Sequence, residues 1–315
     1  MPPTPTLAAP KHLLRVSDLT RDQFEQLLDL AARMKAEPLG WRDAQAGKVL
    51  ACFFSKPSTR TRVSLEAAAQ RLGMLPVMLR PDELQLGRGE PISDTGRVLS
   101  GYVDAITVRT FAQADVDELA AAATVPVINT LTDEHHPCQA LADLLTIRER
   151  FDGLEGLKLA YLGDGNNVAH SLMEAGALFG MELVLATPFG YRPHAEILVA
   201  THDTALEHGG SVTLEPDPSQ AVHGAQVIYT DVWVSMGDDA ERQDRLAALA
   251  DYQVTAELMA SAAWEAIFMH CLPAHRGEEV AAEVIDGPAS VVFQQAGNRL
   301  PTEQALIHSM IGGHI

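Results

Sequence analysis

The sequence predicts an α/β protein made of two doubly wound domains, each with a central parallel sheet flanked by helices. Short apolar or β-branched runs alternate with longer runs of helical spacing along the chain. A chain of 315 residues also exceeds what one compact core usually holds. We therefore expect a first domain over residues 1–150 and a second over 151–315, with a C-terminal helix near 302–312 that packs back on the first domain.

Composition excludes several classes of function. Hydrophobic residues make up 47% of the chain and charged residues 21%, which argues against disorder. The formal net charge of -19 repels nucleic acid and anionic membranes, so we expect neither as a partner. The cysteines, Cys52, Cys138 and Cys271, are odd in number and widely spaced, which fits a reducing compartment and neither a disulfide framework nor a zinc site. Without a signal pattern or a long apolar run, the sequence predicts a cytoplasmic protein.

The first half alternates strand and helix from the beginning. Ser17 and Asp18 are expected to open a helix over 19–35, and Ser93 and Asp94 to cap a helix that continues to 103. The remaining predicted elements are strands over 48–54, 75–79, 105–109 and 125–128 and helices over 59–72, 115–123 and 139–150.

The turn after the first strand is expected to bind a phosphoryl group. Ser58 or Thr59 can cap the following helix, and a helix start presents unpaired N–H groups and the positive end of the dipole. Two hydroxyls and a guanidinium add donors that suit a dianion. Because Arg60 and Arg62 cannot share a helix face, only Arg60 is assigned to the ligand and Arg62 to a structural role. The alternative is an ordinary capped surface helix with solvated arginines.

Further cationic residues follow other strands. Arg109 ends one predicted strand, and His136 follows the next, so both lie where parallel sheets bind ligands. Arg60, Arg109 and Arg299 with a helix start could hold about two negative charges, as a phosphate monoester or acyl phosphate carries. For each residue alone, the alternative is a structural role.

The second half repeats the layout. Strands are expected over 157–162, 183–186, 212–214, 226–229, 266–269 and 290–293, with a helix over 168–179 and a last helix from 302 that follows a loop at Asn298-Arg299. The turn at Gly163 could suggest a dinucleotide, but Val168 stands where glycine or alanine is expected and no carboxylate follows the second strand. We expect no nicotinamide cofactor. Asn166 is expected to cap the helix and Asn167 to contact a small polar ligand.

Two reactive side chains follow later strands of this half. Asp231 could hold an ammonium group, and its alternative is an exposed loop acid. Cys271 stands at a strand tip, where the alternative is a small buried hydrophobe. His270 cannot be its base, because adjacent strand residues face opposite ways.

These segments resemble the carbamoyltransferase family over essentially all 315 residues. Ser58 to Arg62 and His136-Pro137-Cys138-Gln139 are similar to the carbamoyl phosphate motifs that its aspartate and ornithine branches share. The segment from Asp231 to Gly237 and His270-Cys271-Leu272-Pro273 resemble the ornithine branch. Gly297 departs from the family pattern, in which an acidic residue commonly precedes Asn298-Arg299.

The resemblance implies specific site residues. Those implied to bind carbamoyl phosphate are Ser58, Thr59, Arg60, Thr61, Gln85, Arg109, His136, Gln139, Cys271, Leu272 and Arg299. Gln85 would come from a neighbouring subunit of a homotrimer. Those implied to bind ornithine are Asn167, Asp231, Ser235 and Met236. The catalytic residues would be Asp231, Cys271, Arg109 and His136.

The reaction so implied is attack of the ornithine side-chain amine on the carbonyl carbon of carbamoyl phosphate, giving citrulline and phosphate without a metal or organic cofactor. Deprotonating an amine with a lysine-like pKa of about 10.4 costs roughly 4.6 kcal/mol at pH 7. We expect Cys271 to position the reactants, in preference to acting as the sole base. The alternatives are a carbamoyltransferase for putrescine or an acylated ornithine, and a non-catalytic phosphate-binding module.

Overall fold

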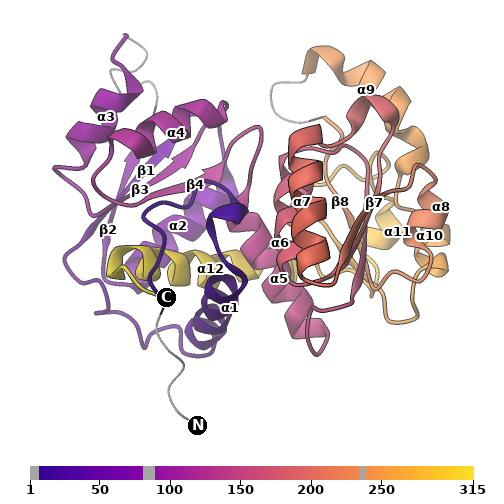
Figure 1. Cartoon of the computed structure of the whole chain (residues 1–315), viewed down its shortest axis with the longest axis horizontal. Coiled ribbons are helices and arrows are strands. Elements are labelled where there is room, and N and C mark those ends of the chain that lie inside the picture. The colour runs from indigo at the N-terminus through magenta and orange to yellow at the C-terminus, as the bar shows by residue number, and fades with distance from the viewer. Residues whose placement is uncertain (1–6, 81–88, 235–238) are drawn as a thin grey trace. The chain divides into compact units, whose positions relative to one another are not determined.

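The computed structural model describes residues 7–80, 89–234 and 239–315. The chain divides into two compact units, Met1–Leu145 with Gly297–Ile315, and Thr146–Ala296. Each unit contains one parallel sheet with helices on both faces, which confirms the predicted fold class (Figure 1). Two helices, α5 (Pro137–Arg150) and α12 (Val292–Gly312), run along the chain from one unit into the other.

The sheet of the first unit has the order β2-β1-β3-β4, and all neighbouring pairs are parallel. The strands are β1 (Val49–Phe54), β2 (Leu75–Leu79), β3 (Ala105–Arg109) and β4 (Val127–Leu131). The chain moves outward from β1 to β2 and then outward on the other side from β3 to β4. The strand order therefore reverses between β1 and β3, and such a switch point is where doubly wound sheets bind ligands.

Helices cover this sheet on both faces. The helices are α1 (Arg21–Ala36), α2 (Thr59–Arg71), α3 (Ile92–Leu99) and α4 (Gln113–Ala122). α3 and α4 pack together on one face and α2 covers the other (Figure 1). Buried apolar residues at helical spacing explain α1, as in Phe24, Leu27, Leu28, Ala31 and Met34.

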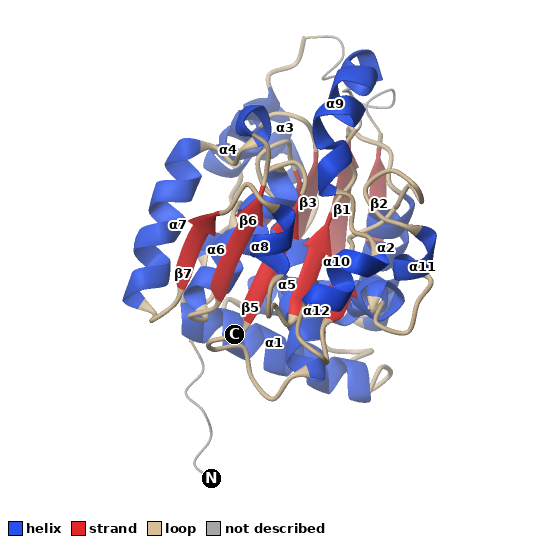
Figure 2. Ribbon diagram, turned by 90° about the vertical axis from the view of Figure 1, so that its right-hand side faces the viewer, coloured by secondary structure: helices blue, strands red, loops and turns tan. Residues whose placement is uncertain are grey.

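The sheet of the second unit has the order β7-β6-β5-β8-β9 and is also fully parallel (Figure 2). The strands are β5 (Lys158–Leu162), β6 (Glu182–Ala186), β7 (Ser211–Leu214), β8 (Val227–Thr230) and β9 (Ile267–Met269). The order reverses between β5 and β8. Because Leu162 pairs with Thr230, the residues that follow these two strands leave the same edge of the sheet.

Helices again lie on both faces of the second sheet. α6 (Asn167–Leu178) packs against α7 (Ala195–Glu207) on one face, and α8 (Pro218–Val222) packs against α10 (Ala256–Ser261) on the other (Figure 1). The remaining helices are α9 (Arg242–Leu249), α11 (Ala282–Ile285) and the 3-10 helices at Val16–Asp18, Phe189–Tyr191, Asp239–Glu241 and Ala250–Tyr252. In the part of the chain that the structure describes, no helix has the length and apolarity needed to cross a membrane.

The predicted strand over 290–293 and the loop at Asn298-Arg299 are wrong. α12 begins at Val292 and continues through Asn298 and Arg299, and only Ser290 bridges to β9, at Phe268. Gly297 and Pro301 read as helix breakers, but the helix accommodates the proline. Beside the proline, the Thr302 hydroxyl donates to the carbonyl of Asn298 at 2.8 Å.

Two predicted helix starts are also wrong. Thr20, not Ser17-Asp18, caps α1, through a capping box with Gln23 in which each side chain accepts from the other residue's backbone N–H. Ser93 and Asp94 lie inside α3, whose N-cap is Pro91. For α1, Thr20 lies close to the predicted cap and competes with it, whereas α3 begins without a side-chain cap.

Candidate functional site

The turn between β1 and α2 presents a helix N-terminus at the switch point of the first sheet. Ser58 is the N-cap of α2, and its Oγ accepts a hydrogen bond from the Thr61 N–H at 3.2 Å. Ser58 and Arg60 are half-buried and Thr59 is exposed. Backbone donors, hydroxyls and the Arg60 guanidinium therefore occupy the first turn of one helix, an arrangement suited to an anion.

A buried lysine fixes the position of this turn. Lys56 forms an ion pair with Asp133, which follows β4, and its ammonium lies 4.2 Å from the centre of the Phe111 ring. Lys56 could not be singled out from the sequence, because its partner is far along the chain. The pair joins the turn after β1 to the turn after β4.

Arg299 of α12 gathers several predicted residues around one guanidinium. Its Nη1 donates to Gln139 Oε1 at 2.9 Å, and its Nη2 donates to Thr61 Oγ1 at 3.2 Å. Gln139 in turn donates from Nε2 to Asp143 Oδ1 at 2.8 Å. Three residues from α2, α5 and α12 thus meet in the first unit.

Glu303 supports Arg299 and was missed. Its Oε1 accepts from Arg299 Nε at 3.1 Å and Nη2 at 2.5 Å. The spacing of four residues would have indicated this pair, had the segment been predicted as helix. A Cβ at Gly297 would have no neighbouring atom within 4 Å, so the surroundings do not require a glycine at this position. Glu303 and Gln139 hold Arg299, and no side chain at position 297 takes part.

Burial and charge determine the protonation of this half-site. Burial, followed by the charges of Arg299, Arg109 and Arg60, lowers the pKa of His136 well below its ordinary value. Burial acts to lower the pKa of Arg299, but Glu303 raises it above its ordinary value. At neutral pH the half-site therefore combines arginine cations with a neutral imidazole, which can donate a hydrogen bond without adding repulsion among the cations.

In the second unit, Asn166 has two roles at the start of α6. Its Oδ1 accepts from the N–H groups of Val168 at 2.9 Å and Ala169 at 3.2 Å, which makes it the N-cap. Its Nδ2 donates to Asp231 Oδ2 at 2.8 Å. The predicted capping role is present, and the contact with Asp231 was missed. Asn167, the first residue of α6, is half-buried at the same turn.

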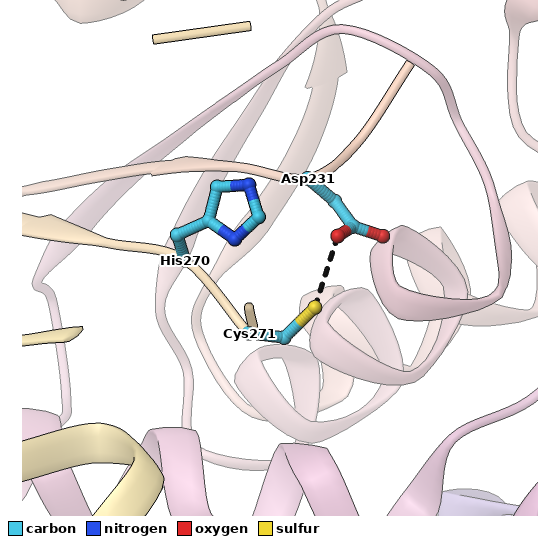
Figure 3. A group of neighbouring side chains, drawn as sticks. All are labelled: Asp231, His270 and Cys271. Carbon is cyan, nitrogen blue, oxygen red and sulfur yellow. Dashed lines mark hydrogen bonds between the residues drawn. The ribbon is translucent and has the colours of Figure 1, made fainter. Parts of the chain in front are cut away.

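Asp231 and Cys271 meet at the carboxyl edge of the second sheet (Figure 3). The Cys271 thiol donates to Asp231 Oδ1 at 2.9 Å. Asp231 is only 5% exposed, so its interpretation as an exposed loop acid is wrong. Cys271 is partly accessible, whereas burial raises the pKa of Cys52 and of Cys138 to about 12.

A buried arginine fixes the beginning of the segment after β8. Arg245 Nε donates to the Trp233 carbonyl at 2.6 Å, and the same guanidinium forms an ion pair with Asp164. Asp164 belongs to the turn after β5. The contact therefore joins the two turns that flank the switch point, and no local sequence pattern indicated it.

The predicted residues fall into two sets by unit. Ser58, Thr59, Arg60, Thr61, Arg109, His136, Gln139 and Arg299 belong to the first unit, and Asn167, Asp231, Cys271 and Leu272 belong to the second. Gln85, Ser235 and Met236 lie outside the described residues.

Among the residues that the structure describes, two groups of side chains offer atoms that could ligate a metal. Asp231, His270 and Cys271 lie with one ligand atom each within 4.8 Å of one another, but each already takes part in a hydrogen bond. His275, Glu278 and Glu279 form the other group, and Glu278 is paired with Arg242. A metal at either place would have to replace these bonds, so neither group carries a metal assignment.

Known proteins match the whole chain. Residues 11–149 match the family model described as aspartate/ornithine carbamoyltransferase, carbamoyl-P binding domain. Residues 155–310 match the model described as aspartate/ornithine carbamoyltransferase, Asp/Orn binding domain.

Individual relatives are similar over almost their full length. The ornithine carbamoyltransferase of Symbiobacterium thermophilum is 56% identical, covering 94% of this chain and 96% of its own. The one from Bacillus subtilis is 52% identical over 96% of this chain and 94% of its own. The solved structure of the Pyrococcus furiosus ornithine carbamoyltransferase has a TM-score of 0.93 at 49% identity, covering 97% of this chain and 98% of that one.

Proposed function

The chain belongs to the aspartate/ornithine carbamoyltransferase family, and from this premise we propose that it transfers the carbamoyl group of carbamoyl phosphate to the side-chain amine of L-ornithine. The products are L-citrulline and phosphate. The observation that carries this function is that each unit has a half-site at its switch point and that the two are chemically unlike. One holds arginines, a helix N-terminus and a neutral histidine, and the other holds a buried carboxylate bonded to a thiol.

The half-site of the first unit suits carbamoyl phosphate. Arg60, Arg109 and Arg299 supply positive charge that matches a phosphoryl dianion, and Ser58 and Thr59 add hydroxyls at the α2 N-terminus. Glu303 balances the charge of Arg299. The net positive charge around the ligand is therefore closer in magnitude to the negative charge of a dianion than three unpaired arginines would give. Binding and leaving-group stabilisation follow from the same fixed charges.

His136 is suited to the carbamoyl carbonyl. Because its pKa is lowered, the ring is neutral at pH 7 and can donate one hydrogen bond to the oxygen that gains charge during attack. Gln139 has an amide nitrogen with two protons, and Asp143 accepts one of them. We assign the second proton to the same ligand.

The half-site of the second unit suits the amine substrate. Asp231 offers a carboxylate to the ornithine side-chain ammonium, and Asn167 offers an amide to its α-amino acid end. The orientation of Asp231 is fixed before the substrate arrives, because Asn166 donates to one oxygen and Cys271 to the other. Such preorganisation lowers the cost of aligning the nucleophile.

The thiol of Cys271 is a hydrogen-bond donor in this arrangement, which supports a positioning role. A thiol that keeps its proton and donates a hydrogen bond to Asp231 is not a thiolate, so it cannot accept a proton from the amine. Desolvation of the bound ornithine lowers its amine pKa, so that the ammonium releases one proton to bulk water. Asp231 then orients the neutral amine toward the carbonyl carbon. After the neutral amine attacks the carbonyl carbon, the C–O bond to phosphate breaks, and the second proton of the nitrogen leaves with the departing phosphate.

We also propose a homotrimer in the cytoplasm. Free Cys52, Cys138 and Cys271 support a reducing compartment. Light scattering on the purified protein should give three times the 34.0 kDa of one chain. A mass of one chain at micromolar concentration would contradict the trimer and leave the reaction proposal intact.

The function is tested by measuring citrulline from carbamoyl phosphate with L-ornithine, putrescine and N-acetylornithine in parallel. We expect turnover with ornithine to exceed that with either other amine by at least about a hundredfold, because each lacks a group that the site binds. Faster turnover of putrescine or N-acetylornithine would overturn the ornithine assignment. Carbamoyl phosphate binding in calorimetry without turnover of any amine would overturn the enzyme assignment.

A further inference from the structure

A buried carboxylate outside the proposed machinery holds both ends of the turn that contains Cys271. Glu279 Oε1 accepts from the ring Nε2 of His270 at 3.2 Å and from the backbone N–H of His275. The side chains of His270 and Glu279 are both 0% exposed. Both ends of the turn 270–275, which follows β9, are therefore bonded to the same carboxylate oxygen.

The hydrogen bonds of His270 define its tautomer. Nδ1 accepts from the Leu272 N–H at 2.8 Å, so it carries no proton. The proton of the neutral ring is then on Nε2, which donates it to Glu279. A continuous chain of bonds thus runs from the Glu279 carboxylate through the imidazole to the backbone of Leu272.

The backbone of Leu272 needs such support. Its φ of 60° is in the left-handed region, which a residue with a branched side chain rarely adopts. The beginning of the turn is also bonded to β8, the strand that Asp231 follows. The His270 N–H donates to Gln295 Oε1 at 2.9 Å, and Gln295 donates to the hydroxyl of Tyr229 on β8 at 3.0 Å.

We propose that Glu279 and His270 are positioning residues for the reaction, which hold the Cys271–Leu272 turn so that the thiol meets Asp231 (Figure 3). Neither side chain is assigned a contact with substrate. Their effect passes through the Leu272 backbone and the direction of the Cys271 side chain. The inference rests on the proposed function for its kinetic consequence, but not for its geometric one.

Isosteric variants separate positioning from simple packing. Glu279→Gln keeps an oxygen that can accept both bonds, whereas Glu279→Ala removes it. His270→Asn presents an amide oxygen about where Nδ1 lies, so it can still accept from Leu272. His270→Gln instead presents an amide nitrogen about where Nε2 lies, so it keeps the bond to Glu279 and loses the one to Leu272. Asp286→Asn is the control, since its exposed ion pair with Arg276 lies in the same segment.

The first readout is the rate at which iodoacetamide alkylates Cys271, measured for each cysteine by mass spectrometry. In the parent protein the thiol is directed at a carboxylate, which slows formation of the reactive thiolate. Release of the turn in Glu279→Ala and His270→Gln should raise the rate at least about fivefold. Glu279→Gln, His270→Asn and Asp286→Asn should stay within about twofold. Cys52 and Cys138 are buried, so an increase in their alkylation would indicate that the whole protein has loosened and not the turn alone.

The second readout is the kinetics of citrulline formation. A misplaced turn should lower kcat at least about tenfold in Glu279→Ala and His270→Gln. The KM for carbamoyl phosphate should stay within about threefold, because its phosphate is bound by the other unit. A general packing defect would also raise labelling of Cys52 and Cys138, and would affect His270→Asn as much as His270→Gln.

Equal alkylation rates and equal kcat in His270→Asn and His270→Gln would overturn the proposal, whether or not Glu279→Ala folds. Rates near the parent value in a folded Glu279→Ala would do the same. If the parent protein forms no citrulline, the proposed function fails, and the alkylation rates alone still decide whether Glu279 and His270 position the thiol.

Discussion

The two sheets use the same backbone device to hold opposite charges. In each unit a helix begins at the switch point and is capped by the side chain of its first flanking residue, Ser58 for α2 and Asn166 for α6. The Ser58 cap leads into a shell of arginines. The Asn166 cap turns its amide toward Asp231 and so fixes an acid. The fold therefore supplies the place for a ligand, and a few side chains decide its charge.

The largest expected effect tests the cationic half-site. Arg60→Ala should lower kcat/KM for carbamoyl phosphate about a thousandfold, or about 4 kcal/mol of transition-state stabilisation, because it removes a charge-assisted donor at the α2 N-terminus. Steady-state kinetics measure this. Arg62→Ala is the matched control, since Arg62 is half-exposed and paired with Glu66 at 3.1 Å, and its effect should stay within about threefold. Similar losses in both variants would mean that α2 does not distinguish the two arginines.

The acidic half-site should respond separately. Asp231→Asn keeps the size of the side chain but removes the charge that attracts the ammonium, and should lower kcat/KM for ornithine about a hundredfold. The affinity for carbamoyl phosphate, measured by calorimetry, should change by less than about threefold. A comparable loss of carbamoyl phosphate affinity would show that the two half-sites are not independent. Asp286→Asn, at an exposed ion pair, serves again as the control.

Sequence patterns predicted what is local in both units. The strand ends, the Ser58 cap and the positions of Arg60 and Asp231 follow from periodicity and turn chemistry within a few residues. The partners that orient these groups could not be predicted in this way. Asn166 and Asp231 are bonded across distant parts of the chain, as are Lys56 and Asp133. Such pairs depend on strand order, which no short window of sequence contains.

The last helix shows the opposite failure, where a local signal was overruled. The sequence predicted a loop at Asn298-Arg299, yet Arg299 lies on a continuous helix that places Glu303 one turn away. Packing of the helix outweighed the cost of Gly297 and Pro301 within it. The error hid the support of Arg299, while the assignment of Arg299 to the anion came from its charge and from the family resemblance.

The neutral histidine makes the first unit pH-sensitive. Burial and the neighbouring arginines lower the folded-state pKa of His136, so below about pH 6.5 the unfolded chain binds more protons than the folded one. Holding His136 neutral costs no stability above about pH 6.5. Below about pH 6.5 the free energy of unfolding falls by about 1.4 kcal/mol per pH unit, because the unfolded chain takes up a proton that the folded chain does not.

Urea unfolding at pH 7.5 and 5.5 measures this loss, with His136→Asn as the comparison. The variant should lose about 1.4 kcal/mol less than the parent protein between the two values, one pH unit of which lies below 6.5. His12 and His308, whose pKa values burial also lowers, are common to both proteins and cancel. Equal losses in parent and variant would mean that His136 is not held neutral by the fold.

The smallest expected effect separates the two functions of the Ser58 cap. Ser58→Ala and Thr20→Ala each remove an N-cap, from α2 and α1 respectively, and each should lower the free energy of unfolding by about 1 kcal/mol. The Ser58 oxygen accepts from Thr61, which leaves its own O–H to donate to a phosphate oxygen. Only Ser58→Ala should therefore also raise the KM for carbamoyl phosphate, by about tenfold. If both variants change stability equally and neither changes KM, Ser58 caps its helix without binding the ligand, and the anion is held by the arginines and the backbone of α2 alone.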